Sequence, residues 1–341
     1  MSYVDQFVRE HIRDIKPYHS ARLENQGEGY TYLDANENPF GRKLNRYPDP
    51  LQHKLKERIA KEKSVDPSKI FVGNGSDEVI DLVIRAFVEP GRDNIIIPVP
   101  TYGMYEISGQ IHGAEIRKVL LNEDFQPDPD AILEQCDRQT KVLFLCSPNN
   151  PTGNLLDEDR LQEVMERFRG IVVLDEAYIE FSNRVGFLHE MERYPNLVIT
   201  RTFSKALGLA GIRTGYAFAD TEIIDVLTKI KPPYNVNRLS QRSALRRMSR
   251  YRQVRKVVRM ISREKDELGR FLRQRAFVEN VFPSDANFLL VKVRDPQSLI
   301  RYLKGNGIII RDRSHEPRCQ GCVRITIGKP GENRRLKKLI I

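Results

Sequence analysis

One lysine lies in a segment whose composition allows a ligand to come close to the backbone. Lys205 stands in FSKALGLAGIRTGY, residues 203–216, where alanines and glycines surround it and Arg213 follows eight positions later. It comes shortly after an apolar run that ends at Thr200. A lysine amine among hydroxyls and glycines, near an arginine, suits a Schiff base beside a bound phosphate. Taken alone, the segment fits an exposed surface lysine equally well.

A carboxylate and an amide stand at the ends of two other apolar runs. Asp175 ends the run in VVLDEAYIEF, residues 172–181, and Asn150 lies in SPNNPTG, residues 147–153. Ligands of open α/β sheets bind at the carboxyl ends of strands. A buried carboxylate needs a cationic partner, and a protonated pyridine nitrogen would be one. The alternatives are an acid that caps a helix and a tight strand-to-helix turn.

A fourth segment can bind an anion. GNGSDE, residues 73–78, leads into an apolar helical stripe, and we expect Ser76 to be the N-cap of that helix. Free backbone N–H groups at a helix N-terminus bind phosphate. Asp77 and Glu78 oppose an anion, so an ordinary N-cap explains the segment about as well as a phosphate site does.

Other motif classes are not supported. Glu78 stands where a dinucleotide fingerprint needs its third glycine, and no Walker lysine follows. None of the six histidines has a second histidine at i+4, which a zinc helix requires. Cys319-x-x-Cys322 is half of a zinc motif, and we interpret it as two unrelated cysteines near a strand. The sequence predicts no metal site.

The order of the apolar runs predicts the elements that must position these residues. Short runs rich in Val and Ile alternate with helical stretches, as in a parallel sheet that is buried on both faces. Beyond a long basic helix the pattern changes to a smaller α+β unit. The predicted organisation has three parts: an N-terminal arm that joins the small domain (1–40), a large domain (41–240) and a small C-terminal domain (241–341).

Composition and charge narrow the class of protein. The chain has 341 residues, 40% of them apolar and 30% charged, with a net charge of +10, which is typical of a globular protein. Much of the excess positive charge lies in residues 242–275, which we expect to form one long helix with a basic outer face. Neither a signal peptide nor an apolar run of about 20 residues is found. Four cysteines are too few for a disulfide scaffold, so we expect a cytoplasmic protein.

The four segments occur in the order phosphate turn, Asn turn, Asp strand and Lys turn. Further motifs accompany them: LDANENPFG (33–41), RYPDP (46–50), PTYGMY (100–105) and VRITIG (323–328). With these, the sequence resembles the fold-type I pyridoxal-phosphate aminotransferases over about residues 18–328, and within them the histidinol-phosphate group. The resemblance implies a large domain with a mostly parallel central sheet flanked by helices, and a smaller α+β domain.

The resemblance implies a pyridoxal 5′-phosphate site. Lys205 would carry the cofactor and shuttle a proton, while Asp175 would pair with the pyridinium nitrogen. Asn150 and Tyr178 would hydrogen-bond the phenolate oxygen, and Tyr102 would stack on the ring. The residues implied for the phosphate are Gly75, Ser76, Asp77, Thr202, Ser204 and Arg213.

The resemblance also implies the reaction and the partners. L-Histidinol phosphate and 2-oxoglutarate would give imidazole-acetol phosphate and L-glutamate, a step of histidine biosynthesis. The residues implied for substrate binding are Arg324, Arg311, Tyr18 and Asn36, and Tyr47 would reach the phosphate of a neighbouring subunit in a homodimer. Three alternatives stay open: a threonine-phosphate decarboxylase, an aromatic amino acid aminotransferase and a basic nucleic-acid-binding protein.

Overall fold

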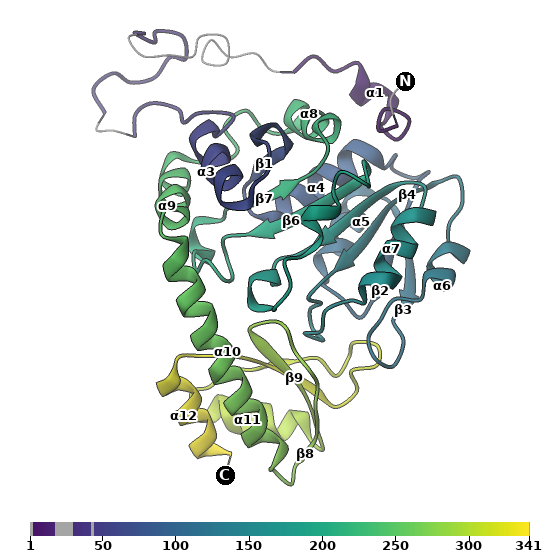
Figure 1. Cartoon of the computed structure of the whole chain (residues 1–341), viewed down its shortest axis with the longest axis vertical. Coiled ribbons are helices and arrows are strands. Elements are labelled where there is room, and N and C mark those ends of the chain that lie inside the picture. The colour runs from purple at the N-terminus through teal and green to yellow at the C-terminus, as the bar shows by residue number, and fades with distance from the viewer. Residues whose placement is uncertain (1–2, 18–29, 42–43, 341) are drawn as a thin grey trace.

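The larger of two sheets lies at the centre of a computed structural model that describes residues 3–17, 30–41 and 44–340 (Figure 1). Its strand order is β1-β7-β6-β5-β4-β2-β3, and β7 alone runs antiparallel to its neighbours. The strands are β1 (Ile70–Gly73), β2 (Asn94–Val99), β3 (Glu115–Leu120), β4 (Thr140–Cys146), β5 (Ile171–Asp175), β6 (Leu197–Thr202) and β7 (Gly215–Phe218). The prediction of an α/β fold with a mostly parallel central sheet is confirmed.

Helices cover both faces of this sheet, because its strands are apolar on both sides. Ile95 and Ile97 of β2 belong to one buried cluster, and Ile96 between them belongs to the other. The first cluster includes α4 (Ser76–Phe87), α5 (Met104–His112) and α8 (Thr221–Ile230). The second includes α3 (His53–Lys63), α7 (Glu158–Arg167) and α9 (Arg238–Met248), with α6 (Pro129–Glu134) beside α7. Four short 3₁₀ turns complete the unit: η1 (Pro67–Lys69), η2 (Ile179–Phe181), η3 (Phe187–Glu190) and η4 (Ala210–Ile212).

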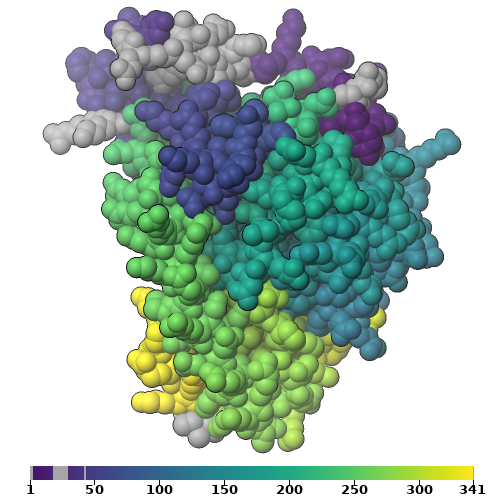
Figure 2. All heavy atoms as spheres, in the orientation of Figure 1, coloured from purple at the N-terminus to yellow at the C-terminus, as the bar shows by residue number. Residues whose placement is uncertain are grey.

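A second, antiparallel sheet lies below the first in Figure 1, with strand order β10-β11-β9-β8. Its strands are β8 (Val278–Val281), β9 (Phe288–Val293), β10 (Arg311–Asp312) and β11 (Cys322–Thr326), and its helices are α10 (Tyr251–Arg273), α11 (Pro296–Gly305) and α12 (Pro330–Leu339). Leu336 of α12 and Ile340 are buried in its core, so the C-terminal helix completes this unit. The space-filling view shows the second unit packed against the lower end of the first (Figure 2).

The single long helix predicted over 242–275 is wrong, because the chain forms α9 and α10 there, with a break at Ser249 and Arg250. The hydroxyl of Ser249 donates to the carbonyl of Leu245 at 3.0 Å, a side-chain bond that slightly destabilises and often bends helices. Tyr251 then begins α10 as a buried side chain. Neither glycine nor proline marks this break, so the sequence pattern could not reveal it.

The N-terminal arm was expected to join the small domain, and its first described part does not do so. Val4, Val8 and Ile12 are buried in the cluster of α4 and α8, and α1 (Glu10–Arg13) lies beside α8 at the far end from the second sheet (Figure 1). The physical reason is an apolar stripe at spacing four, which packs as a short helical segment.

Within the described residues, no helix is long and apolar enough to cross a membrane.

Candidate active site

A cavity of about 250 Å³ lies where β4, β5 and β6 end and α4 begins. Parallel strands end at one edge of a sheet, so the predicted Asn, Asp and Lys segments meet there. The residues that line the cavity are Ser76, Asp77, Tyr102, Cys146, Asn150, Asp175, Ala177, Tyr178, Thr202, Ser204, Lys205, Ala210, Arg213, Arg313 and Arg324. The structure therefore brings together most of the side chains that the sequence motifs singled out.

Lys205 reaches the cavity from the turn that follows β6. Its carbonyl accepts the N–H of Gly208 at 2.9 Å, which folds the segment back. Its Nζ lies 5.3 Å from the centre of the Tyr178 ring. Burial among the surrounding groups, and then the charge of Arg324, lower the pKa of Lys205. A lower pKa increases the neutral fraction of the amine, the form that attacks a carbonyl.

Asp175 is a buried carboxylate that forms no ion pair with any residue the structure describes. It is 3% exposed, and it accepts hydrogen bonds from the Tyr105 hydroxyl at 2.8 Å and the Ala177 N–H at 3.0 Å. Burial raises the pKa of Asp175, while these hydrogen bonds lower it. A buried charge without a partner is costly. The site therefore favours a ligand that brings a cationic group to this position.

The beginning of α4 forms the anion-binding side of the cavity. Gly75, with φ of +86°, is the N-cap, so the prediction that Ser76 would be the cap is wrong by one residue. A side chain on Gly215 of β7 would place its Cβ 2.3 Å from the backbone nitrogen of Ser76, so glycine is what lets the strand approach the helix start. Arg213 lies 3.0 Å from the Asp77 carboxylate and offsets its charge.

The SPNNPTG turn is rigid, and it presents Asn150 to the cavity. The Asn149 amide donates to the carbonyl of Pro100 at 2.9 Å and to the hydroxyl of Thr152 at 2.8 Å. Asn150 is buried, and its side-chain oxygen accepts a hydrogen bond from Arg324 of β11. Arg324 is the point at which the second sheet contributes to the site.

Two tyrosines complete the cavity walls. The Tyr102 hydroxyl donates to Asp77 at 3.1 Å, and its ring meets that of Tyr105 edge to face, with centroids 5.5 Å apart. Tyr178 follows Asp175 by three residues and is buried. Burial is the main reason that the pKa of both Tyr102 and Tyr178 is raised, so both hydroxyls keep their protons at neutral pH.

Among the residues that the structure describes, four predicted site residues do not line this cavity, and one of them, Gly75, is the N-cap directly before Ser76. Arg311 is exposed on β10, opposite Arg324 in the strand register. Asn36 is exposed, with φ of +53°. Tyr47 is 46% exposed and stacks on Tyr234 with ring centroids 4.3 Å apart. Tyr18 lies outside the described residues.

Two residues of the site were missed from the sequence. Arg313 lines the cavity beside Arg324. It stands two positions after Arg311, on the same side of an extended segment, and this alternation was the available signal. Tyr105 bonds Asp175, and it lies one helical turn after Tyr102 in the PTYGMY motif.

Comparison with known proteins places this geometry in context. Residues 33–340 match the family model described as aminotransferase class I and II. A histidinol-phosphate aminotransferase of Parabacteroides distasonis is 51% identical over 333 residues, which span 98% of this chain and 96% of that protein.

Solved structures show the same architecture. Histidinol-phosphate aminotransferase from Sinorhizobium meliloti, in complex with pyridoxal 5′-phosphate, superposes with a TM-score of 0.80 at 25% identity, covering 90% of this chain and 89% of that one. An L-threonine-O-3-phosphate decarboxylase from Porphyromonas gingivalis superposes with a TM-score of 0.73 at 27% identity, covering 86% and 92%. The fold is thus similar to enzymes of more than one activity. The two solved structures do not differ much in identity (25% and 27%), whereas the relative that is 51% identical is a histidinol-phosphate aminotransferase.

Proposed function

This chain belongs to the class I and II aminotransferases and, within them, to the histidinol-phosphate aminotransferases, and we propose that it uses pyridoxal 5′-phosphate to transfer the amino group of L-histidinol phosphate to 2-oxoglutarate. The products would be imidazole-acetol phosphate and L-glutamate, formed in a reversible ping-pong sequence. The observation that carries the proposal is the meeting of Lys205, the unpaired Asp175 and Arg324 in one cavity.

The donor set suits this cofactor. Asp175 offers a buried negative charge to a ring nitrogen, and it lacks a cationic partner among the described residues. The N-terminus of α4, with Arg213 beside it, suits a phosphate. The Thr202 and Ser204 hydroxyls lie on the same wall of the cavity. When bound, the cofactor supplies an aldehyde that links to amines and a ring that withdraws electrons from the substrate Cα.

Each side chain has a distinct task in this proposal. Lys205 attaches the cofactor and moves a proton to and from the substrate Cα, which the lowered pKa of its amine favours. Asp175 would keep a proton on the ring nitrogen, because a buried carboxylate stabilises a cationic group beside it. Asn150 and Tyr178 hydrogen-bond the phenolate oxygen, and Tyr102 covers one face of the ring.

The two arginines that line the cavity besides Arg213 select the substrates. Arg324 and Arg313 both line the cavity, and both come from the second sheet and the segment beside it. A guanidinium fork binds carboxylate and phosphate groups alike. The pair therefore accepts the carboxylate of glutamate in one half-reaction and the phosphate of histidinol phosphate in the other.

A second copy of the chain would complete the site. Tyr47 lies outside its own cavity and is 46% exposed. Three residues later, the carbonyl of Pro50 accepts a hydrogen bond from Nζ of Lys231 at 2.9 Å, which holds the segment in place. We propose that this tyrosine reaches the cofactor phosphate of the partner in a homodimer.

The test is a comparison of three substrates with the purified enzyme. We expect glutamate to form from 2-oxoglutarate and histidinol phosphate with a kcat/KM exceeding that for phenylalanine by about 10- to 100-fold, the effect of one charge-assisted anion contact. Phenylalanine turning over faster would contradict the substrate assignment and keep the reaction class. Carbon dioxide released from O-phospho-L-threonine, without formation of a keto acid, would favour a decarboxylase.

A further inference from the structure

A buried ion pair joins the ends of β5 and β6 on the side of the sheet away from Lys205. Glu176 directly follows Asp175, and Arg201 directly precedes Thr202. Nη2 and Nε of Arg201 lie 2.7 and 2.9 Å from Oε2 of Glu176. The side chains are 3% and 1% exposed, so both charges are removed from water.

The alternation of side chains along a strand explains this placement. Val173 of β5 belongs to the cluster of α4, while Val172 and Leu174 belong to the cluster of α3. By this alternation, Asp175 and Thr202 point to the α4 side, and Glu176 and Arg201 point to the α3 side. The ion pair therefore does not touch the cavity that holds Lys205, and neither of its members lines that cavity.

The loop after η2 closes over the pair. Oε1 of Glu176 accepts the Phe187 N–H at 2.7 Å, and Arg201 donates to the Val185 carbonyl at 3.1 Å. Gly186, with φ of +79°, lies so close that a Cβ there would be 2.3 Å from Oε1 of Glu176. Each charged group thus has hydrogen bonds in addition to its partner, which is what a buried pair needs to persist.

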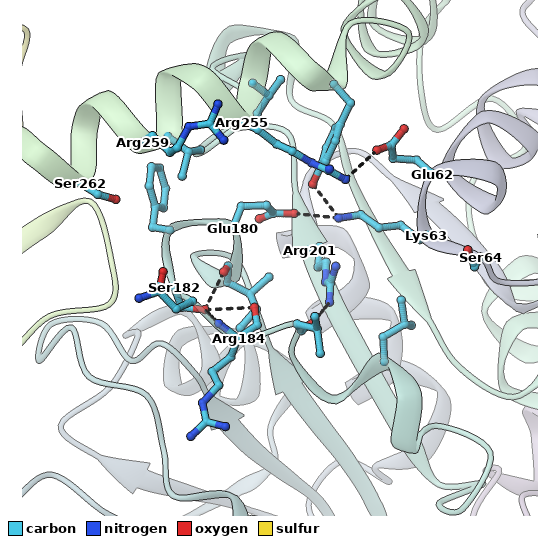
Figure 3. Close-up of a pocket in the computed structure, with 18 of the residues that line it drawn as sticks. Glu62, Lys63, Ser64, Glu180, Ser182, Arg184, Arg201, Arg255, Arg259 and Ser262 are labelled. Carbon is cyan, nitrogen blue, oxygen red and sulfur yellow. Dashed lines mark hydrogen bonds and ion pairs between the residues drawn. The ribbon is translucent and has the colours of Figure 1, made fainter.

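A second pair extends the network to the helix that connects the two sheets. Lys63 of α3 lies 3.5 Å from Glu180 and 2.7 Å from the Tyr251 hydroxyl at the start of α10. Figure 3 shows Lys63, Glu180 and Arg201 at the base of a separate cavity of about 830 Å³, beneath α10. The network is thus reached from the face opposite the candidate active site.

The strand ladder stops where the pair begins. The last register partners of β5 and β6 are Asp175 and Thr200, followed by one backbone bond of 2.9 Å from the Glu176 N–H to the Thr200 carbonyl. Beyond this point no β5–β6 ladder bond ties the two strand ends to each other among the described residues. Asp175 is still paired with Cys146 of β4, and Thr202 with Gly215 of β7, so the ladder holds each end through its outer neighbour and leaves the link between the two ends to the ion pair. We infer that Glu176 and Arg201 are positioning residues, which lock the ends of β5 and β6 so that Asp175 and Thr202 face the proposed cofactor; the inference rests on the proposed function.

The test compares variants that change the pair to different degrees. Arg201→Met removes the cation, Arg201→Lys keeps the charge without the fork, and Glu176→Gln is nearly isosteric. The control is Arg167→Met, which removes a surface arginine that is 2.7 Å from Asp130 and remote from the site. For each variant we would measure the Kd for added pyridoxal phosphate, the pH midpoint of the visible band of the bound cofactor, and Tm without cofactor.

We expect Arg201→Met to raise the Kd by about 10- to 100-fold, because misplacing a binding group by about 1 Å has effects of this size. The pH midpoint should shift with it, since the direction of Asp175 determines how firmly the ring nitrogen keeps its proton. Arg201→Lys should recover part of both changes, and Arg167→Met should alter neither.

The outcomes separate this inference from the proposed function. Wild-type protein that takes up no pyridoxal phosphate would contradict the proposed function. The positioning role would be overturned if the wild-type protein binds the cofactor and the Arg201→Met and Glu176→Gln variants fold with the same Kd and the same pH midpoint. This holds even if the Tm of the variants falls. If Arg201→Met fails to fold, Glu176→Gln decides the question alone, because it keeps the volume and the bond to the Phe187 N–H.

Discussion

Replacing Asp175 by Asn separates the proposed chemistry from the fold. The side chain is 3% exposed and accepts two hydrogen bonds, from the Tyr105 hydroxyl at 2.8 Å and the Ala177 N–H at 3.0 Å. An Asn oxygen can keep the bond to Ala177, and the Tyr105 hydroxyl can rotate to accept from the Asn amide. The substitution therefore removes a charge with little change in shape.

The charge matters only when a cationic ring nitrogen faces it. Removing one member of a buried ion pair costs about 3–5 kcal/mol. If that loss appears in the transition state, kcat falls by about 150- to 5,000-fold, at 1.36 kcal/mol per tenfold. Tyr105→Phe keeps the carboxylate and removes one bond to it, so its loss should be smaller, about 10- to 100-fold.

The stability of the cofactor-free protein should change in the opposite direction. Burial raises the pKa of Asp175 in the folded state above its pKa in the unfolded chain. As pH rises from the unfolded pKa to the folded pKa, the ionisation of Asp175 therefore disfavours folding more and more. Asn lacks this penalty. Cofactor-free Asp175→Asn should therefore have a Tm at pH 7–8 equal to or above that of the wild type, with about 1–2 °C per kcal/mol gained in a chain of 341 residues.

Two assays decide the outcome: steady-state transfer from histidinol phosphate to 2-oxoglutarate, and thermal unfolding without cofactor. A kcat within tenfold of the wild type would refute the assigned role of Asp175. A large fall in both Tm and kcat would mean that the carboxylate stabilises the folded protein. The proposed pairing with a ring nitrogen would then lose its support.

Three further predictions concern other parts of the site. Arg324→Lys should lower kcat/KM for both glutamate and histidinol phosphate by about 10- to 100-fold, because the fork is lost, with an unchanged Kd for the cofactor as the control measurement. Gly215→Ala should weaken cofactor binding, because its Cβ would lie 2.3 Å from the Ser76 nitrogen, whereas Gly211→Ala, with nothing within 4 Å, should not; equal titration curves would contradict this. The rate of cofactor attachment should rise with pH, with its midpoint at the pKa of Lys205, below 10.5. Arg324→Gln should move this midpoint to higher pH, because the charge of Arg324 lowers the pKa of Lys205. An unchanged midpoint would show that the two charges do not interact.

The parts of the fold that were predictable share one property, a local pattern that tertiary contacts reinforce. One of the short runs rich in Val and Ile covers Asn94–Val99, and it is β2 without change, while the stripe from Ser76 is α4. Residues Gly307–Arg311 also have the apolar pattern of a strand, but only Arg311–Asp312 form one, β10, because Gly307 belongs to the turn that ends α11 and takes a positive φ of +73°. A local sequence pattern does not predict a strand correctly where contacts with a neighbouring element decide which of its residues pair.

The site was predictable as far as its motifs reached. Lys205, Asp175 and Asn150 stand at strand ends, and the topology of a parallel sheet brings such ends together. Arg313 and Tyr105 could not be assigned in this way, because their roles depend on how the second sheet and α5 pack against that edge. The pair of Glu176 and Arg201 needs the same three-dimensional information.

The central claim is that Lys205 carries the cofactor in a site whose arginines, Arg313 and Arg324, bind anionic substrates. Borohydride reduction of the protein after incubation with pyridoxal phosphate, followed by peptide mass spectrometry, tests it most directly. We predict one modified peptide, with the label on Lys205, and loss of the label when L-histidinol phosphate is added before reduction. Label on another lysine, or no label, would contradict the claim.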